Sequence, residues 1–175
     1  MRPPKIVPDV VAPHLQVLFV GVNPGIRSGD THHHFAHPSS RLWTALYRSG
    51  FTSQLIRPAG ERALLDYGIG LTNLVDRPTR AADELTVAEL RSGGAQLWRK
   101  ACRYRPDWVA ILGVVAYRIA FDEPNAVVGL QRRTLCSSRV WVLPGPTGRN
   151  AHFPMPKLTE EFRRLRRHAR PIKKP

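Results

Sequence analysis

The stretch from Gln16 to Gly25 constrains the fold of this chain more than any other. Its sequence, QVLFVGVNPG, is a short apolar run that stops at Asn-Pro-Gly. A run rich in β-branched and aromatic residues and bounded by turn residues predicts a buried strand that feeds a loop. Pro24 disfavours helical backbone at Asn23, so we expect the chain to turn there. Ligands of open α/β sheets bind at the carboxyl ends of strands, which makes Asn23 a candidate site residue. The alternative is an Asn that completes its own turn.

Strand and helix patterns alternate along the rest of the chain. Further strands are predicted at 68–75, 108–112 and 139–143. Helices are predicted at about 39–49, 59–66, 85–104, 113–121 and 157–168, with Ser39 or Ser40 capping the first and Thr86 the third. This alternation predicts a single α/β domain with a mainly parallel central sheet and helices on both faces.

The ends of the chain differ in composition from its middle. Residues 1–14 contain four prolines and are expected to form a flexible, extended N-terminal arm. Residues 15–169 form the predicted domain, which is long enough to bury a core. Residues 170–175 form a basic tail.

The charge of the chain indicates a polyanionic partner. Lys and Arg number 27 against 13 Asp and Glu, for a formal net charge of +14. The simplest partner is nucleic acid, and an anionic membrane surface is the competing one. No apolar run is long enough to span a membrane, and the Pro-broken start does not resemble a signal peptide. We therefore expect a cytoplasmic protein that reaches the nucleoid through DNA, with Cys102 and Cys136 reduced.

Several motifs together resemble one family, the mismatch-specific uracil-DNA glycosylases, which are close to the thymine-DNA glycosylases. They keep the family order and cover most of the chain from about residue 15 to residue 167. They are GVNPG (21–25), FAHPSSRLW (35–43), LLDYGIGLTNLVDRPTRAADELT (64–86), PDWVAILGVVAY (106–117) and VWVLPGPTGRNAHFP (140–154).

The resemblance implies a uracil-DNA glycosylase-like fold and a monofunctional DNA glycosylase of base excision repair. Such an enzyme flips uracil out of duplex DNA and hydrolyses its N-glycosidic bond, leaving an abasic site. Thymine and damaged pyrimidines are further candidate substrates. The expected partner is double-stranded DNA with uracil or a mismatched pyrimidine, and the expected state is a monomer without a metal or cofactor. Two cysteines cannot supply the four ligands of the iron–sulfur cluster in other uracil glycosylases.

The same resemblance assigns roles to single residues. Asn23 matches the catalytic Asn, whose amide orients the attacking water without a covalent intermediate. Main-chain N–H groups around Val22 and Phe35 face the base carbonyls, and the Phe35 ring stacks on the flipped pyrimidine. The alternative for Phe35 is a core residue. Asp76 is a second catalytic candidate, as a base or as a stabilising charge; its alternatives are a solvated turn residue or a partner for Arg77.

The loop GPTGRN corresponds to the wedge that the family inserts into the space left by the flipped base. Arg149 falls at the inserted position, although an ordinary exposed basic residue is the alternative. Bacterial relatives often carry Asn where this chain has glycine at the start of the loop, which leaves mismatch preference open. The predicted wedge comprises Gly145, Pro146, Thr147, Gly148 and Arg149.

The histidines at positions 32, 33, 34 and 37 invite a metal-site interpretation; a weak adventitious site stays open, but a zinc enzyme is not expected. His32, His33 and His34 are consecutive and should point in different directions, and no carboxylate or Cys has suitable ligand spacing.

Two other function classes remain. The first is a catalytically weak nucleic-acid-binding protein on the same scaffold. The positive charge and the basic C-terminal helix would suit such a protein as well as they suit an enzyme. The second is a nucleotide-binding α/β protein, which ranks low because GVNPG lacks the GxGxxG pattern and Pro24 should prevent a helix directly after the strand.

Overall fold

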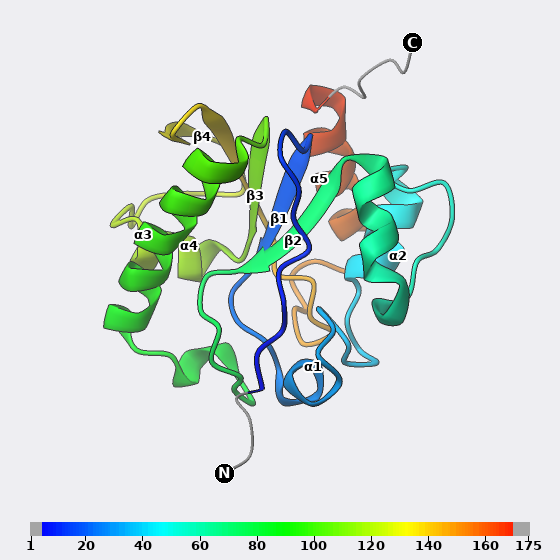
Figure 1. Ribbon diagram of the computed structural model, residues 1–175, viewed down its shortest axis with the longest axis horizontal. Helices are drawn as coiled ribbons and strands as arrows, with labels where there is room; N and C mark the ends of the chain where they lie inside the picture. Colours follow the sequence, from blue (N-terminus) through cyan, green and yellow to red (C-terminus); the bar gives the residue numbers. More distant parts are fainter. Residues whose placement is uncertain (1–4, 170–175) are drawn as a thin grey trace.

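A five-stranded sheet forms the centre of the protein in the computed structural model, which describes residues 5–169. The strand order is β2-β1-β3-β5-β4, and every neighbouring pair is parallel except β4 with β5. This confirms the predicted fold class (Figure 1). The strands are β1 (Val17–Gly21), β2 (Ile69–Asn73), β3 (Trp108–Leu112), β4 (Gly129–Leu135) and β5 (Ser138–Leu143).

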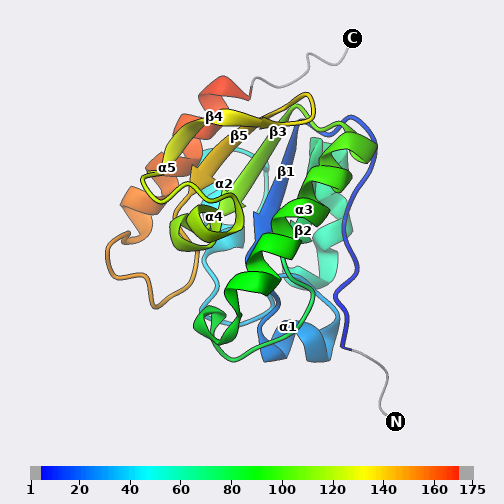
Figure 2. The same cartoon turned by 90° about the vertical axis from the view of Figure 1, so that its left-hand side faces the viewer.

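Helices cover both faces of the sheet, as Figure 2 also shows. Because side chains alternate along a strand, Phe19 of β1 packs on one face and Leu18 on the other. The Phe19 face is covered by α2 (Leu42–Ser49), the 3₁₀ segment η1 (Pro58–Tyr67) and α5 (Met155–His168). The Leu18 face is covered by α3 (Val87–Tyr104) and α4 (Val114–Ala120).

The helix starts show where local signals were sufficient. Thr86 caps α3 as predicted, accepting a hydrogen bond from the N–H of Glu89, whose carboxylate accepts one from the N–H of Thr86. The predicted cap of α2 is wrong: the helix begins at Leu42 after Arg41, without a side-chain cap. The Ser39 hydroxyl lies 2.7 Å from His37 Nδ1, because residues 37–40 form a turn of their own.

Two short helical elements were not predicted from the sequence, and the expectation that Pro24 prevents a helix directly after the first strand is wrong. Helix α1 (Ile26–Thr31) begins immediately after Gly25, although Pro24 was expected to prevent a helix there. The segment η2 (Ala82–Glu84) is a single 3₁₀ turn. The predicted helix at 59–66 is η1, which is 3₁₀ rather than α-helical.

A disulfide joins Cys102 on α3 to Cys136 in the turn between β4 and β5, with Cα atoms 5.2 Å apart. The expectation of reduced thiols is therefore wrong. Strand β4, which was not predicted, carries the chain back to the end of α3 and so brings the two cysteines together.

The described part of the N-terminal arm packs against the sheet. Val10 and Leu71 exchange two backbone hydrogen bonds of 2.9 and 2.8 Å, and Val7 and Val10 are buried. The predicted basic tail, 170–175, lies outside the described residues. Across residues 5–169, no helix combines the length and apolar character needed to cross a membrane.

Candidate active site

The carboxyl ends of β1, β2 and β3 meet at one edge of the sheet. The segments α2 and η1, which follow β1, cover one face of the sheet, and helix α4, which follows β3, covers the other. Because β1 and β3 are neighbours, the chain leaves these two strands toward opposite faces. Crevices of this kind are the ligand sites of open α/β sheets. The loops after β1 and β2 lie side by side here, because the Leu74 and Val75 N–H groups donate to the Gly21 and Val22 carbonyls.

The side chain of Asn23 is held in one orientation at this edge. Its Nδ2 donates to the Arg77 carbonyl oxygen at 2.8 Å and to Thr79 Oγ1 at 2.7 Å. The partners lie 54 and 56 residues away, so the alternative of an Asn that completes its own turn is wrong. Asn23 Oδ1 accepts no hydrogen bond from the described residues and is not buried. The arrangement presents one oriented amide oxygen as an acceptor.

Asp76 lies on the same loop as the partners of Asn23, at the predicted end of the sheet. It is exposed and forms no ion pair or hydrogen bond with residues 5–169. Arg77 pairs instead with Glu89, at 2.7 and 3.1 Å, so the alternative of an Asp76–Arg77 pair is wrong. The hydrogen bond from Arg77, together with that from the Thr86 N–H, lowers the pKa of Glu89 to about 2. Asp76 is left as an unpaired carboxylate.

Phe35 is half-buried, and its ring lies over the end of β1. A Cβ atom at Gly21 would lie 3.0 Å from its Cζ. Its φ of +49° is left-handed, which is uncommon for a residue with a side chain. Two hydrogen bonds hold this backbone: the Trp43 indole donates to the Phe35 carbonyl at 3.1 Å, and the N–H of His34 donates to Glu61 at 2.8 Å.

Asn73 is a further candidate site residue, which the sequence analysis did not single out. It ends β2 opposite Gly21, and its side chain is buried beside Phe35. A Cβ atom at Gly21 would lie 2.4 Å from Asn73 Oδ1, so only glycine allows this close approach. A weaker signal was present, because Asn73 follows the short run Ile69-Gly70-Leu71-Thr72, in which Thr72 alone is polar.

His34 fixes the amide of Asn73. His34 is buried, and burial lowers its pKa, which favours the neutral ring. Its Nε2 lies 2.9 Å from the Pro8 carbonyl and must donate to it. Its Nδ1 is then an acceptor for Asn73 Nδ2 at 3.4 Å. Asn73 Oδ1 is consequently turned toward Gly21 and Phe35.

A model of one family, the uracil DNA glycosylase superfamily, matches residues 8–170. The chain belongs to this superfamily. It is therefore a hydrolase of the DNA glycosylase type, with uracil-DNA glycosylase-type activity, DNA as substrate and a place in DNA repair.

The predicted wedge of this glycosylase is an irregular loop between β5 and α5. Thr147, Gly148 and Arg149 are exposed, whereas Pro146 is buried. The loop rests on the segment that leads from Phe35 to α2, since a Cβ atom at Gly148 would lie 3.0 Å from the Ser39 Cβ.

Basic side chains without an ion pair among the described residues lie on the segments that follow β1, β2 and β5. They are exposed and make no ion pair within residues 5–169, which suits contact with DNA phosphates. They are Arg27, Arg57, Arg80, Arg149 and Lys157. On α5, by contrast, Arg163, Arg164 and Arg167 pair with Glu160 or Glu161.

The histidines next to Phe35 diverge. His32 contacts the Ile6 carbonyl, His33 contacts Glu61 at 3.1 Å, and His34 lies between Pro8 and Asn73. Within the described chain, no three His, Cys, Asp or Glu side chains form a group that could hold a metal ion.

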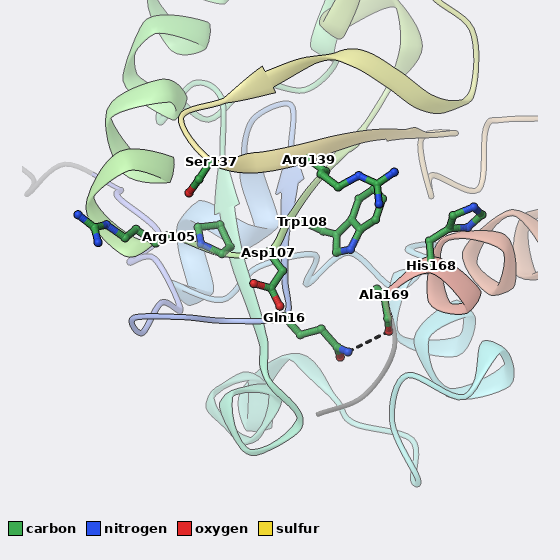
Figure 3. Close-up of a pocket in the computed structure, with 9 residues that line it drawn as sticks. Gln16, Arg105, Asp107, Trp108, Ser137, Arg139, His168 and Ala169 are labelled. Atoms are coloured by element: carbon green, nitrogen blue, oxygen red, sulfur yellow. Dashed lines mark hydrogen bonds between the residues drawn. The ribbon is translucent and has the colours of Figure 1, made fainter. Parts of the chain in front are cut away.

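Two cavities differ in their relation to this edge. One of about 280 Å³ lies beside Phe35 and His37 and is lined largely by apolar side chains, among them Trp43 and Ile56. Another, of about 500 Å³, lies at the opposite end of the sheet. There the side chains of Arg105 and Arg139 point to opposite sides, so its charged groups do not converge (Figure 3).

Proposed function

We propose that the chain is a monofunctional glycosylase that removes uracil from duplex DNA, including uracil opposite guanine, and leaves an abasic site. The observation that carries this proposal is the amide of Asn23, which two hydrogen bonds fix just after β1 and whose Oδ1 accepts no hydrogen bond from residues 5–169. An oriented acceptor of this kind can hold a water molecule for attack on the deoxyribose C1′.

Asn23 acts by orientation rather than by proton abstraction, because a carboxamide takes up no proton at neutral pH. As the glycosidic bond breaks, the sugar becomes cationic and the departing uracil anionic. The main-chain N–H groups of Val22 and Phe35 stabilise the uracil anion, which is most effective in a site that excludes water. Water is the attacking group in this proposal, so no covalent intermediate forms.

Phe35 and Asn73 form the proposed recognition site for the base. The Phe35 ring stacks on the extruded pyrimidine, a contact worth roughly 1–3 kcal/mol. Asn73 Oδ1, turned away from His34, accepts a hydrogen bond from the N3–H of uracil or thymine. Cytosine has an unprotonated N3 and offers no such donor. This geometry favours uracil and thymine over cytosine.

Asp76 is assigned the secondary catalytic role. Its unpaired carboxylate at the same edge is suited to stabilise the cationic sugar. Asn23 remains the primary group because two hydrogen bonds fix its amide, whereas Asp76 has no hydrogen bond within residues 5–169.

Gly145, Pro146, Thr147, Gly148 and Arg149 form the proposed wedge. The exposed Arg149 fills the space of the extruded nucleotide and contacts the opposing base, since a guanidinium can both stack and donate hydrogen bonds. The enzyme acts as a monomer in the cytoplasm and needs no cofactor.

A substrate panel tests the proposal. Purified full-length chain is incubated in single turnover with duplexes carrying G:U, A:U or G:T and with single-stranded uracil DNA, followed by alkaline cleavage of abasic sites. Strand cleavage at uracil in duplex DNA is expected. Tight DNA binding without cleavage of any substrate would favour the catalytically weak nucleic-acid-binding protein instead.

A further inference from the structure

Arg41 connects two parts of the site that are far apart in the sequence. Its Nη1 donates to the Phe153 carbonyl at 2.6 Å, and its Nη2 donates to the carbonyls of Thr147 at 2.7 Å and Asn150 at 3.3 Å. Its backbone N–H donates to the Pro146 carbonyl at 2.8 Å. One residue at the start of α2 thus holds four carbonyl groups of the loop between β5 and α5.

The guanidinium of Arg41 has no competing partner. Within residues 5–169 it forms no ion pair, and its Nε is buried without a hydrogen bond. Its two terminal nitrogens are therefore committed to the loop alone. A half-buried charge compensated only by carbonyl dipoles is costly unless the geometry is maintained, which indicates a fixed rather than an incidental contact.

Within residues 5–169, the hydrogen bonds that join this loop to a segment distant in the sequence all come from Arg41. Residues 144–154, all of them described, contain no helix or strand. Its internal hydrogen bonds are four short-range ones of 3.0–3.4 Å, from the N–H groups of Asn150, Ala151 and Phe153 and from Asn150 Nδ2, and they tie the loop only to itself. The position of the exposed Arg149 therefore depends on Arg41.

Arg41 is also close in sequence to the stacking candidate. Only five residues separate it from Phe35, and Trp43, two residues beyond Arg41, donates to the Phe35 carbonyl. Two neighbouring residues of the segment 35–43 therefore hold the two parts of the site: Trp43 holds the Phe35 backbone, and Arg41 holds the wedge loop.

We propose that Arg41 is a positioning residue that holds the wedge loop at a fixed place relative to the base-stacking ring. The inference rests on the proposed function, because it concerns how the duplex is opened. A wedge is needed only where a base must leave a duplex. Loss of Arg41 should therefore impair cleavage of duplex substrates more than cleavage of single strands.

The test compares Arg41→Met with Arg48→Met, a matched control that removes the same charge from an exposed position on α2. Single-turnover rates are measured on G:U duplex and on single-stranded uracil DNA. Arg41→Met should slow duplex cleavage at least tenfold and single-strand cleavage less than threefold, and Arg48→Met should change neither by more than twofold. Equal losses on both substrates, or no loss, would overturn the proposal.

A second measurement does not depend on activity. Trypsin cleavage after Arg149 is followed in the free protein by mass spectrometry, and it should be at least tenfold faster in Arg41→Met than in Arg48→Met. Arg41→Lys keeps the charge and can reach one carbonyl, so its rate of trypsin cleavage should lie between those of Arg41→Met and Arg48→Met. This variant replaces Arg41→Met if the latter does not fold. Equal cleavage rates would overturn the positioning role. A wild-type protein inactive on both DNA substrates would refute the proposed function while leaving this test intact.

Discussion

Replacing Thr79 by Val tests whether the orientation of Asn23 matters for the chemical step. Thr79 is buried, its Oγ1 accepts from Asn23 Nδ2 at 2.7 Å, and it donates to the Ala81 carbonyl at 2.8 Å. Val has nearly the same shape but neither hydrogen bond. A neutral hydrogen bond contributes about 1 kcal/mol net. If that energy fixes the Asn23 amide, the single-turnover rate should fall about fivefold.

The assay uses enzyme in excess over a uracil-containing duplex, well below the melting temperature of the variant. Thr79→Val should also lose about 1 kcal/mol of stability, because the half-buried Ala81 carbonyl keeps only the Glu84 N–H as a donor, at 3.2 Å. Thr79→Ser keeps the hydroxyl and should retain the wild-type rate, while duplex affinity stays unchanged in both variants. A folded Thr79→Val enzyme as fast as Thr79→Ser would refute the reasoning.

Three further predictions concern other parts of the molecule. Asp76→Asn should keep the single-turnover rate within about tenfold if the carboxylate only assists Asn23; a loss of about 100-fold or more, the scale of a general base, would transfer the primary role to Asp76. Cys136→Ser, which opens a disulfide with a sequence separation of 34, should lower the free energy of unfolding by about 3–4 kcal/mol in urea titrations, and an unchanged midpoint would contradict this. Burial lowers the pKa of His34 in the folded protein from its ordinary value of 6.5, so the unfolded state binds more protons in acid. The free energy of unfolding should therefore fall as the pH drops below about 6.5, and it should fall less in His34→Gln. Thermal melting at a series of pH values measures both.

Much of the fold was predictable because its signals are local. The apolar run at 108–112 and the Thr86–Glu89 capping pair each specify an element from a few neighbouring residues. Strand β4, GLQRRTL, was missed because it is an edge strand whose middle is polar and largely exposed. The disulfide was missed with it, since only the β4–β5 turn brings Cys136 to α3.

The candidate site also combines residues that local patterns indicate with residues that they do not. Asn23 and Phe35 could be assigned from motifs that match a family, and Asn73 carried a weaker signal at the end of the second strand. The hydrogen bonds that orient them come from distant residues: Thr79 holds Asn23, and Arg41 holds the predicted wedge. No local pattern in the sequence indicates such partners, because the tertiary fold alone decides which loops lie next to each other.

The most direct test of the account is the single-turnover rate of Asn23→Ala on G:U duplex, measured together with duplex affinity. If Asn23 places the attacking water, the rate should fall by about 100-fold or more, which is about 2.7 kcal/mol or more of barrier. Affinity should stay within about threefold, because Asn23 contacts its own loops rather than the DNA backbone. A rate within about threefold of wild type, a difference under about 1 kcal/mol, would contradict the central claim.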